Sequence, residues 1–314
     1  MLYTDFMKKG VFCIDERYQR QSFPLLYDIL KLTNSYYPQN VKIQEEGAIK
    51  KSIITLKEGL QIESVLIPMK NSGTLCISSQ VGCKKACRFC ETGRMGLLKN
   101  LEVEEIITQV FIARFIFNFS FRNIVFMGMG EPFDNFASVK KAIDILTDPG
   151  GMAFGASRIT VSTSGAVDKI YAMMEEIPSV HLAVSVNAPN DEIRTKIMPI
   201  NRKWNMQKLK KAMRDYNVRK NKPILIEYVL LKDINDRLEH ARELAAYLEG
   251  LDVKVNIIPY NPQTNDLFSP PPESQIHDFL KELRKAGFYT LLRNTKGRSI
   301  QAGCGQLGNV LLKK

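Results

Sequence analysis

From about Glu104 onward, stretches with helical spacing of apolar residues alternate with short runs rich in β-branched side chains. This alternation is typical of repeated βα units built around a parallel sheet. The candidate strands are the short apolar runs at 124–127, 159–161, 182–185, 224–229 and 253–258. The sequence therefore predicts an α/β protein in which strands and helices take turns along the chain.

Two of the predicted helices have clear signals at both ends. The helix at 237–248 ends before Gly250, and glycine favours the end of a helix. The helix at 273–285 follows a run of prolines and ends before Gly287. Both helices fit the alternation of strands and helices.

A small β element precedes this alternation. The segments 52–56, 61–67 and 74–78 have strand patterns, with turns predicted at 57–59 and 71–73. The strand at 74–78 and the later strands give about six βα units, fewer than the eight that close a full barrel. We therefore expect a partial, open βα barrel whose ligands lie at the carboxyl ends of the strands.

The chain divides into two predicted parts. Residues 1–60 form a short lead-in with the first part of the β element, and residues 1 to about 50 are weakly defined. Residues 61–314 form the barrel and end in a segment that carries Cys304.

The composition is that of a folded protein. Of the 314 residues, 45% are hydrophobic and 25% are charged, as in ordinary globular domains. The longest apolar stretch, 106–119, is interrupted by Gln109, Arg114 and Asn118, so it is too short and too polar to span a bilayer. The N-terminal residues include acidic side chains and lack the apolar core of a secretory signal. We therefore expect a cytosolic (cytoplasmic) protein that does not associate with a membrane.

The charge balance suggests a polyanionic partner. Forty-four Lys and Arg residues against 33 Asp and Glu residues give a net charge of +11. RNA is the natural partner for such a surplus. The basic residues are spread along the chain, so a surface charge that only keeps the protein soluble is an equally good interpretation.

The six cysteines are Cys13, Cys76, Cys83, Cys87, Cys90 and Cys304. Four of them fall within fifteen residues, and in a reducing compartment such clustering indicates metal or redox chemistry rather than structural disulfides. Three have the spacing Cys83-Lys-Lys-Ala-Cys87-Arg-Phe-Cys90 and follow the predicted strand at 74–78. A 4Fe-4S cluster takes four cysteines, so three leave one iron open to a small molecule. A zinc site completed by one of the other cysteines, Cys76 or Cys304, is the alternative.

Longer motifs around these cysteines help to decide between an iron-sulfur cluster and a zinc site. Thr-Leu-Cys76-Ile-Ser-Ser-Gln-Val-Gly-Cys83, Phe-Cys90-Glu-Thr-Gly-Arg-Met-Gly and Gly-Cys304-Gly-Gln-Leu closely resemble the RlmN/Cfr family of RNA adenine methyltransferases. The similarity covers residues 61–307. The resemblance implies the radical S-adenosylmethionine (SAM) type of barrel, a 4Fe-4S cluster on the three clustered cysteines, and SAM as the second cofactor.

The resemblance also implies catalytic roles outside the cluster. Cys304 would receive a methyl group from one SAM molecule and lose a hydrogen atom to a radical derived from a second. The resulting carbon would add to adenine C2 or C8, and Cys76 would release the product through a transient disulfide with Cys304. Glu63, thirteen residues before Cys76, matches the proton acceptor of the family. Without the resemblance, Cys76 would be a small buried residue, Cys304 an idle thiol and Glu63 an exposed strand residue.

Four loops resemble the cofactor contacts of the family. Gly128-Met-Gly130-Glu131-Pro follows the strand at 124–127, where glycine lets a ligand approach the backbone closely. The other implied contacts, in loops after predicted strands, are Ser162, Ser185, Val186, Asn187 and Asn261. Turn formation or helix capping is the alternative for each of these residues.

The sequence departs from the family pattern in three ways. Asn187 replaces a common histidine, the basic run at 296–301 replaces an acidic one, and only 62 residues precede Glu63 where relatives usually carry a longer helical domain. The resemblance implies an RNA substrate, either rRNA or tRNA, and a one-electron reductase such as flavodoxin or ferredoxin. A radical enzyme with a non-RNA substrate would not need the pair Cys76 and Cys304, and a zinc-stabilised RNA-binding protein would not need the Gly-rich loop.

Overall fold

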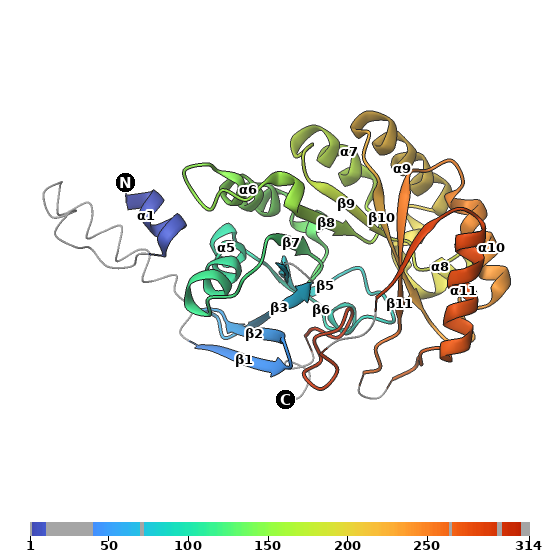
Figure 1. Cartoon of the computed structure of the whole chain (residues 1–314), viewed down its shortest axis with the longest axis horizontal. Helices are drawn as coiled ribbons and strands as arrows, with labels where there is room; N and C mark the ends of the chain where they lie inside the picture. The colour runs from blue at the N-terminus through green and yellow to red at the C-terminus, as the bar shows by residue number, and fades with distance from the viewer. Residues whose placement is uncertain (1, 11–39, 70–71, 264–265, 294–296, 309–314) are drawn as a thin grey trace, which may run out of the picture.

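The computed structural model describes residues 2–10, 40–69, 72–263, 266–293 and 297–308. A sheet of ten strands forms its centre, and helices cover the outside of the sheet (Figure 1).

The larger part of the sheet is parallel. Its strands, in spatial order, are β4 (Ser72–Cys76), β7 (Asn123–Phe126), β8 (Ile159–Thr163), β9 (His181–Ser185), β10 (Ile224–Leu230), β11 (Val253–Pro259) and β12 (Tyr289–Leu292). β10 and β11 are buried at most positions, as expected of parallel strands that are covered on both faces.

Three antiparallel strands extend this sheet on the β4 side. They are β1 (Asn40–Glu46), β2 (Ile49–Thr55) and β3 (Gln61–Met69). The strand order therefore runs from β1 to β12, and the described strands include no pairing between these two that would close a barrel.

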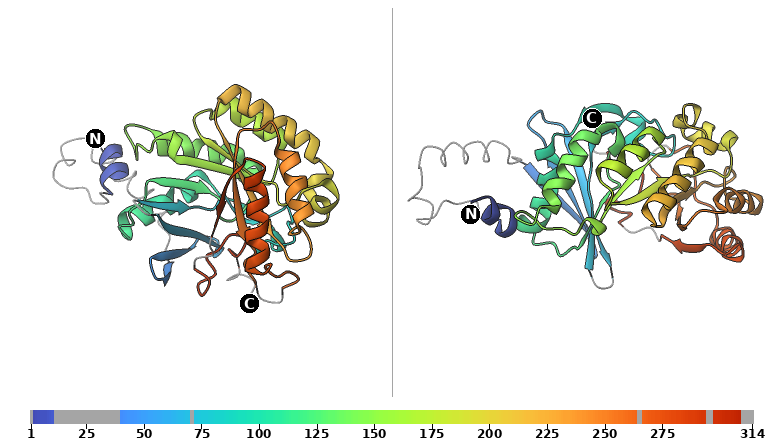
Figure 2. Two further views of the ribbon diagram at one scale, coloured as in Figure 1. Left: turned by 45° about the vertical axis from the view of Figure 1, so that its right-hand side comes forward. Right: turned by 90° about the horizontal axis from the view of Figure 1, so that it is seen from above.

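The helices follow one another round the outside of the sheet, from green to red in Figure 2. Between and after the parallel strands lie α6 (Phe136–Thr147), α7 (Val167–Glu176), α8 (Asp191–Ile197), α9 (Met206–Lys220), α10 (Leu238–Leu248) and α11 (Glu273–Lys285). Short 3₁₀ turns lie at Pro132–Asn135, Ala156–Arg158 and Pro199–Arg202. Each long helix buries one apolar stripe, which in α11 consists of Ile276, Phe279, Leu280 and Leu283.

A two-stranded ribbon is separate from the main sheet. It pairs β5 (Gln80–Cys83) with β6 (Gly96–Asn100), and the short helix α4 (Glu91–Arg94) lies between them in sequence. The ribbon therefore closes the loop that contains Cys87 and Cys90.

The longest apolar stretch of the sequence is helical. It forms most of α5 (Val103–Phe111) and a π-helical turn at Ile112–Ile116. The N-terminal helix α1 (Leu2–Lys9) packs against it, with the Phe6 and Phe111 rings stacked at a centroid distance of 4.8 Å. No helix in the described part of the chain is long and apolar enough to cross a membrane.

The predicted fold class is confirmed, and the predicted strands of the barrel agree with the observed ones to within about two residues. The helix predicted at 273–285 has those bounds in the structure, and the one predicted at 237–248 begins one residue later, at Leu238. The division of the chain at residues 60 and 61 stays a prediction. β2 and β3, on either side of it, pair in one sheet.

Some predicted details are wrong. The lead-in up to residue 50 contains two regular elements in its described part, the helix α1 and the strand β1. The strand predicted at 74–78 covers Ser72–Cys76, so its last two residues belong to the exit loop. Gly73, predicted in a turn, is a strand residue, and Asn71 of that turn lies outside the described residues. β12 was not predicted, because it is a four-residue edge strand with only one buried position.

Candidate active site

The three clustered cysteines lie on a loop that folds back on itself. Cys83 ends β5, and it is buried like Cys87, whereas Cys90 is partly buried. The Cys90 amide donates to the Cys87 carbonyl over 3.1 Å. A Cβ at Gly93 would lie only 3.0 Å from the Cys87 nitrogen, so glycine lets the following helix approach the loop closely.

The three thiols lie close together, as the effect of their charges on one another's pKa shows. Burial raises the pKa of Cys83 to about 12 and that of Cys90 above its usual value. The pKa of Cys87 is raised well above its usual value by burial and then by the charges of the other two thiols. Raised pKa values favour the protonated thiols. A bound cation reverses this preference and holds such groups as thiolates.

The donor set fits an iron-sulfur cluster. No group of three His, Cys, Asp or Glu side chains among the described residues is placed to hold a metal ion. Ligands of one zinc ion all lie at about 2.3 Å from the same atom, whereas each cysteine of a 4Fe-4S cluster binds a different iron. The three thiols are neighbours but are not placed around a single ion. This arrangement matches a 4Fe-4S cluster, in which each cysteine binds its own iron.

The Gly-rich loop after β7 reaches the ribbon. Gly130 has a φ of +100°, and a Cβ there would lie 2.5 Å from the Gln80 Cβ. Glu131 is buried, and its Oε2 accepts hydrogen bonds from the Ser164 amide at 2.8 Å and the Ser164 hydroxyl at 2.6 Å. Burial raises the pKa of Glu131, and the bonds from Ser164 oppose that rise.

Four more predicted cofactor contacts are Ser162 and Ser185, at the carboxyl ends of β8 and β9, and Val186 and Asn187, in the loop after β9. Both serines are partly exposed, whereas Val186 and Asn187 are buried. Asn187 has a left-handed φ of 56°, which asparagine tolerates, and its Oδ1 accepts from the Val229 amide at 2.9 Å. The buried Arg194 donates to the carbonyls of Ser185 and Val186 at 3.2 and 3.1 Å. The serines are therefore accessible to a ligand, and the Asn187 side chain bonds within the protein.

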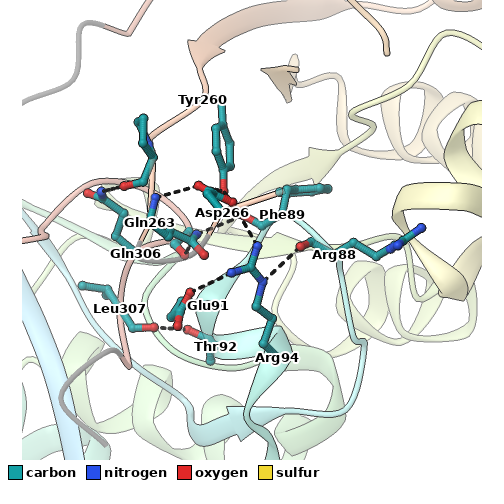
Figure 3. A network of polar contacts seen from close by, with 12 residues as sticks. Arg88, Phe89, Glu91, Thr92, Arg94, Tyr260, Gln263, Asp266, Gln306 and Leu307 are labelled. Carbon is teal, nitrogen blue, oxygen red and sulfur yellow. Dashed lines mark hydrogen bonds and ion pairs between the residues drawn. The ribbon is translucent and has the colours of Figure 1, made fainter. Parts of the chain in front are cut away.

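The C-terminal segment, residues 297–308, lies against the cluster loop and the loop after β11. The Gly305 carbonyl accepts hydrogen bonds from the Glu91 amide and from the Gln263 side chain, both at 2.7 Å. Figure 3 shows the Thr92 hydroxyl directed at the Leu307 carbonyl, over 2.7 Å. These contacts connect three parts of the chain that are far apart in sequence.

Asp266 is the centre of the polar network in Figure 3. It accepts hydrogen bonds from the Tyr260 hydroxyl and the Gln263 amide, both at 2.7 Å, and from Arg94 at 3.1 Å. Arg94 also pairs with Glu91 at 3.4 Å. The loop after β11 is thereby fixed to the helix that follows Cys90.

Asn261 contacts the C-terminal segment directly. Its Nδ2 donates to the Cys304 carbonyl at 3.1 Å. Its Oδ1 is buried and has no hydrogen-bond partner among the described residues. A buried acceptor of this kind is expected to bind a ligand or water.

Cys76 and Cys304 lie near enough for the charge of Cys304 to affect Cys76, although they are 228 positions apart in sequence. Burial raises the pKa of Cys76 to about 12, and the charge of Cys304 adds to the rise. Cys304 is exposed, and desolvation by the surrounding protein, followed by the charge of Glu227, raises the pKa of its thiol. Arg293 lowers the pKa of both thiols, and Cys90 of the cluster loop also acts on Cys304.

Glu63 is buried on β3, so the interpretation as an exposed strand residue is wrong. Its Oε2 lies 3.6 Å from the Lys51 Nζ, and each of the two side chains is 2% exposed. The Gly308 amide of the C-terminal segment donates to the same oxygen at 3.3 Å. Burial raises the pKa of Glu63, and Lys51 opposes the rise.

Three charged residues of this site were missed in the sequence. Lys51 on β2, Glu227 on β10 and Arg293 after β12 surround the two thiols and Glu63. Glu227 is buried and accepts from Asn256 at 2.7 Å. A charged residue within a predicted apolar strand was the available signal at Glu227, whereas Lys51 lay just before the strand predicted at 52–56 and had no such signal. Arg293 had no such signal, because the strand before it was not predicted.

Comparisons with known proteins identify the class of protein to which the chain belongs. A family model described as the radical SAM superfamily matches residues 77–248. The crystal structure of a radical SAM methyltransferase from Sphaerobacter thermophilus is similar with a TM-score of 0.90 and 36% identity, covering 97% of this chain and 91% of that one. The fold and the three-cysteine loop thus define a radical SAM protein.

Two curated relatives identify the family within this class. A probable dual-specificity RNA methyltransferase RlmN 1 from Protochlamydia amoebophila is 50% identical and covers 100% of this chain and 88% of the relative. A probable dual-specificity RNA methyltransferase RlmN from Dictyoglomus thermophilum is 43% identical and covers 88% of this chain and 80% of the relative. The chain belongs to the RlmN family of radical SAM methyltransferases, and it is an enzyme. The resemblance drawn from the cysteine motifs is confirmed.

Proposed function

We propose that the protein methylates a ring carbon of adenine, C2 or C8, in rRNA or tRNA. The relatives named above are called RNA methyltransferases, and the net charge of +11 suits a polyanionic substrate. A reaction that inserts a carbon at these positions needs a radical, because these ring carbons are too poor as nucleophiles to attack a sulfonium methyl group.

One observation carries the proposal. Cys76 and Cys304 come from opposite ends of the barrel sequence, yet the charge of one thiol acts on the other beside the cluster loop. A radical enzyme that acts without a protein-bound carbon has no use for such a pair. An enzyme that carries the transferred carbon on one cysteine and releases it with another needs both.

The loop cysteines Cys83, Cys87 and Cys90 would hold a 4Fe-4S cluster, with SAM at the remaining iron. When bound, this pair supplies one-electron chemistry that starts from reductive cleavage of SAM. The side chains and backbone groups that would hold SAM are those of Gly130, Glu131, Ser162, Ser185, Val186, Asn187 and Asn261. The accessible serine hydroxyls and the unpartnered Asn261 Oδ1 are free to bind polar atoms of the cofactor.

The protein's own groups then divide the remaining work. Cys304 would carry the carbon on its sulfur while the carbon bonds to the adenine ring. Glu63 would take the proton that leaves the substituted ring carbon. Cys76, as a thiolate, would attack the Cys304 sulfur, so that the S–S bond forms as the bond from Cys304 sulfur to the transferred carbon breaks. The carbon and the attached ring would take the electron pair of that bond, and a proton from solvent would complete the methyl group. Arg293 favours this step because its charge opposes part of the rise in the pKa of Cys76 that burial causes.

Anaerobic reconstitution tests the proposal. We expect about four irons per chain, 5′-deoxyadenosine when SAM and a one-electron reductase such as flavodoxin or ferredoxin are added, and methyladenine in RNA. Mass spectrometry of digested RNA distinguishes C2 from C8 products. Cofactor cleavage without methylated RNA would favour a different substrate, and one tightly bound zinc with no iron would exclude the radical chemistry proposed here.

A further inference from the structure

A buried ion pair links the N-terminal strands to the catalytic segment. Lys51 and Glu63 come from neighbouring strands, in which Ile53 pairs with Glu63 and Lys51 pairs with Val65. The two side chains are thus diagonal neighbours on one face, a separation that a lysine can span. Their charged atoms lie 3.6 Å apart, and both side chains are 98% shielded, with 2% exposed.

Both members of the pair also contact the C-terminal segment. Lys51 Nζ donates to the Gln301 carbonyl at 3.5 Å, and Glu63 Oε2 accepts from the Gly308 amide at 3.3 Å. These two positions lie on either side of Cys304 in the sequence. The pair therefore contacts both arms of the loop that carries the catalytic thiol.

The strand β1, which pairs with β2, contacts the C-terminal segment at a second place. Glu46, the last residue of β1, accepts hydrogen bonds from the Gly297 amide at 2.9 Å and the Ser299 amide at 2.6 Å. A carboxylate bound by successive backbone amides is a specific contact rather than a chance surface approach. The strands β1 and β2 thus form a platform on which the C-terminal segment rests.

Lys51 favours the charged form of Glu63 against the effect of burial. A lone buried carboxyl binds its proton more tightly than in water and so cannot act as a base. Of the described charged side chains, Lys51 acts on Glu63 directly. The Gly308 amide also donates a hydrogen bond to Glu63. On β4, the strand that pairs with β3 on its other side, the titratable residue is Cys76. Glu63 Oε1 is buried and has no partner among the described residues, so it is the oxygen that can receive a proton.

We propose that Lys51 is a positioning residue for proton removal: it keeps Glu63 in the carboxylate form while the C-terminal segment is in place. This inference rests on the proposed role of Glu63 as the proton acceptor. Glu63 takes the proton from the ring carbon and becomes a neutral acid, and Lys51 stays an ammonium throughout. No electron is exchanged in this step.

Infrared titration of the purified protein tests the inference without any turnover. The carbonyl band of protonated Glu63 is assigned by subtracting the spectrum of Glu63→Gln. We expect Lys51→Met to move the titration of Glu63 to higher pH by about one unit or more, as for loss of an opposite charge at this distance. Lys51→Arg should stay within about half a unit of the wild type.

Lys50→Met is the matched control, because Lys50 is the neighbouring residue of β2 and pairs with the exposed Glu45. It should leave the Glu63 titration unchanged. Lys51→Gln serves as a second charge-removing variant should Lys51→Met fold poorly by circular dichroism. If folded Lys51→Met or Lys51→Gln titrates like the wild type, the inference is wrong.

Turnover of the reconstituted enzyme separates this inference from the proposed function. Lys51→Met should shift the pH profile of RNA methylation upward, since its Glu63 ionises only at higher pH. The double variant Lys51→Met/Glu63→Gln should be no slower than Glu63→Gln alone. A wild type that methylates no RNA contradicts the proposed function, whereas an unshifted profile in Lys51→Met contradicts the role of Lys51.

Discussion

Cys304 and Glu227 show how the charge of one residue sets the reactivity of another. Glu227 is buried on β10, and its charge raises the pKa of the Cys304 thiol. Burial raises the pKa of Glu227 itself, and Arg293 opposes that rise. The thiol therefore meets a negative charge only when the pH exceeds the raised pKa of Glu227.

Replacing this carboxylate should make Cys304 more reactive. We expect Glu227→Gln to be alkylated at Cys304 by iodoacetamide several-fold faster, up to about tenfold for one pKa unit. The difference should grow as the pH rises through the pKa of Glu227, because only the ionised form repels the thiolate. Mass spectrometry of the Cys304 peptide measures the rate, with Glu249→Gln as the control. Equal rates at a pH between the pKa of Glu227 and that of the Cys304 thiol would contradict the assignment.

For single residues, the sequence predicted which side chains form the site better than it predicted the residues that surround them. The spacing of Cys83, Cys87 and Cys90 follows from what a cluster requires, so it is visible in a short motif. The partner of Glu63 is not visible, because Lys51 reaches it only through the register of β2 on β3. Contacts between residues far apart in sequence depend on that register and need the structure.

At the scale of single elements, the loops at the carboxyl ends of the strands determine the site. Gly130 follows β7 with a φ of +100°, and the added Cβ of an alanine would meet the Gln80 Cβ at 2.5 Å. Gln80 in turn binds the Glu131 amide at 2.8 Å. A shift at this point would move the glutamate that we place near SAM.

Gly130→Ala should therefore lower the free energy of unfolding by about 1–3 kcal/mol, from backbone strain and overpacking. Gly59→Ala is a suitable control, because Gly59 also has a positive φ, 78°, but has no atom within 4 Å of the added Cβ. Thermal and urea unfolding measure the difference. Equal losses in the two variants would mean that the contact with Gln80 relaxes freely.

The C-terminal segment depends on a few side-chain hydrogen bonds. Gln263 donates to the Gly305 carbonyl at 2.7 Å and to the Phe89 carbonyl at 3.2 Å. We expect Gln263→Ala to weaken the docking of the segment by about 1–2 kcal/mol. Hydrogen exchange of the Glu91 amide, which also bonds to Gly305, should become faster by roughly tenfold.

Gln275→Ala provides the comparison for that experiment, since Gln275 makes a similar bond to the Asp236 carbonyl, at 3.2 Å. It should leave the exchange of Glu91 unchanged. Unaltered exchange in Gln263→Ala would show that the other contacts of the segment are sufficient to hold it.

Strands and helices of the barrel were predictable because each is a local pattern. β10 and β11 are rich in β-branched and other apolar residues, and α11 has a proline before it and a glycine after it. β12 and β1 were missed because edge strands alternate weakly and expose most positions. Their existence depends on neighbours in the sheet rather than on their own composition.

On the scale of the whole molecule, the sheet brings the two ends of the sequence together. β1 and β2 extend the β4 side of the sheet, and the segment 297–308 returns to them from the other end. Figure 1 shows this segment, in red, near the strands drawn in blue. The N-terminal strands are thus part of the site and not only a lead-in to the barrel.

The net charge of +11 leads to a prediction for substrate binding. We expect the affinity for a labelled RNA hairpin to fall by on the order of tenfold for a fourfold rise in salt, as for about two neutralised phosphates. Fluorescence anisotropy measures this change, and SAM binding in the same buffers is the control. A flat salt dependence would mean that the basic residues serve solubility and not RNA binding.

We propose that Cys76 releases the carbon that Cys304 carries, and a trapped intermediate tests this pairing most directly. Reconstituted Cys76→Ala, incubated with RNA, SAM and reductant, cannot release the carbon from Cys304. The account predicts a covalent protein–RNA adduct that mass spectrometry locates at Cys304, and no adduct in Cys76→Ala/Cys304→Ala. Free, fully methylated RNA from Cys76→Ala would contradict the account.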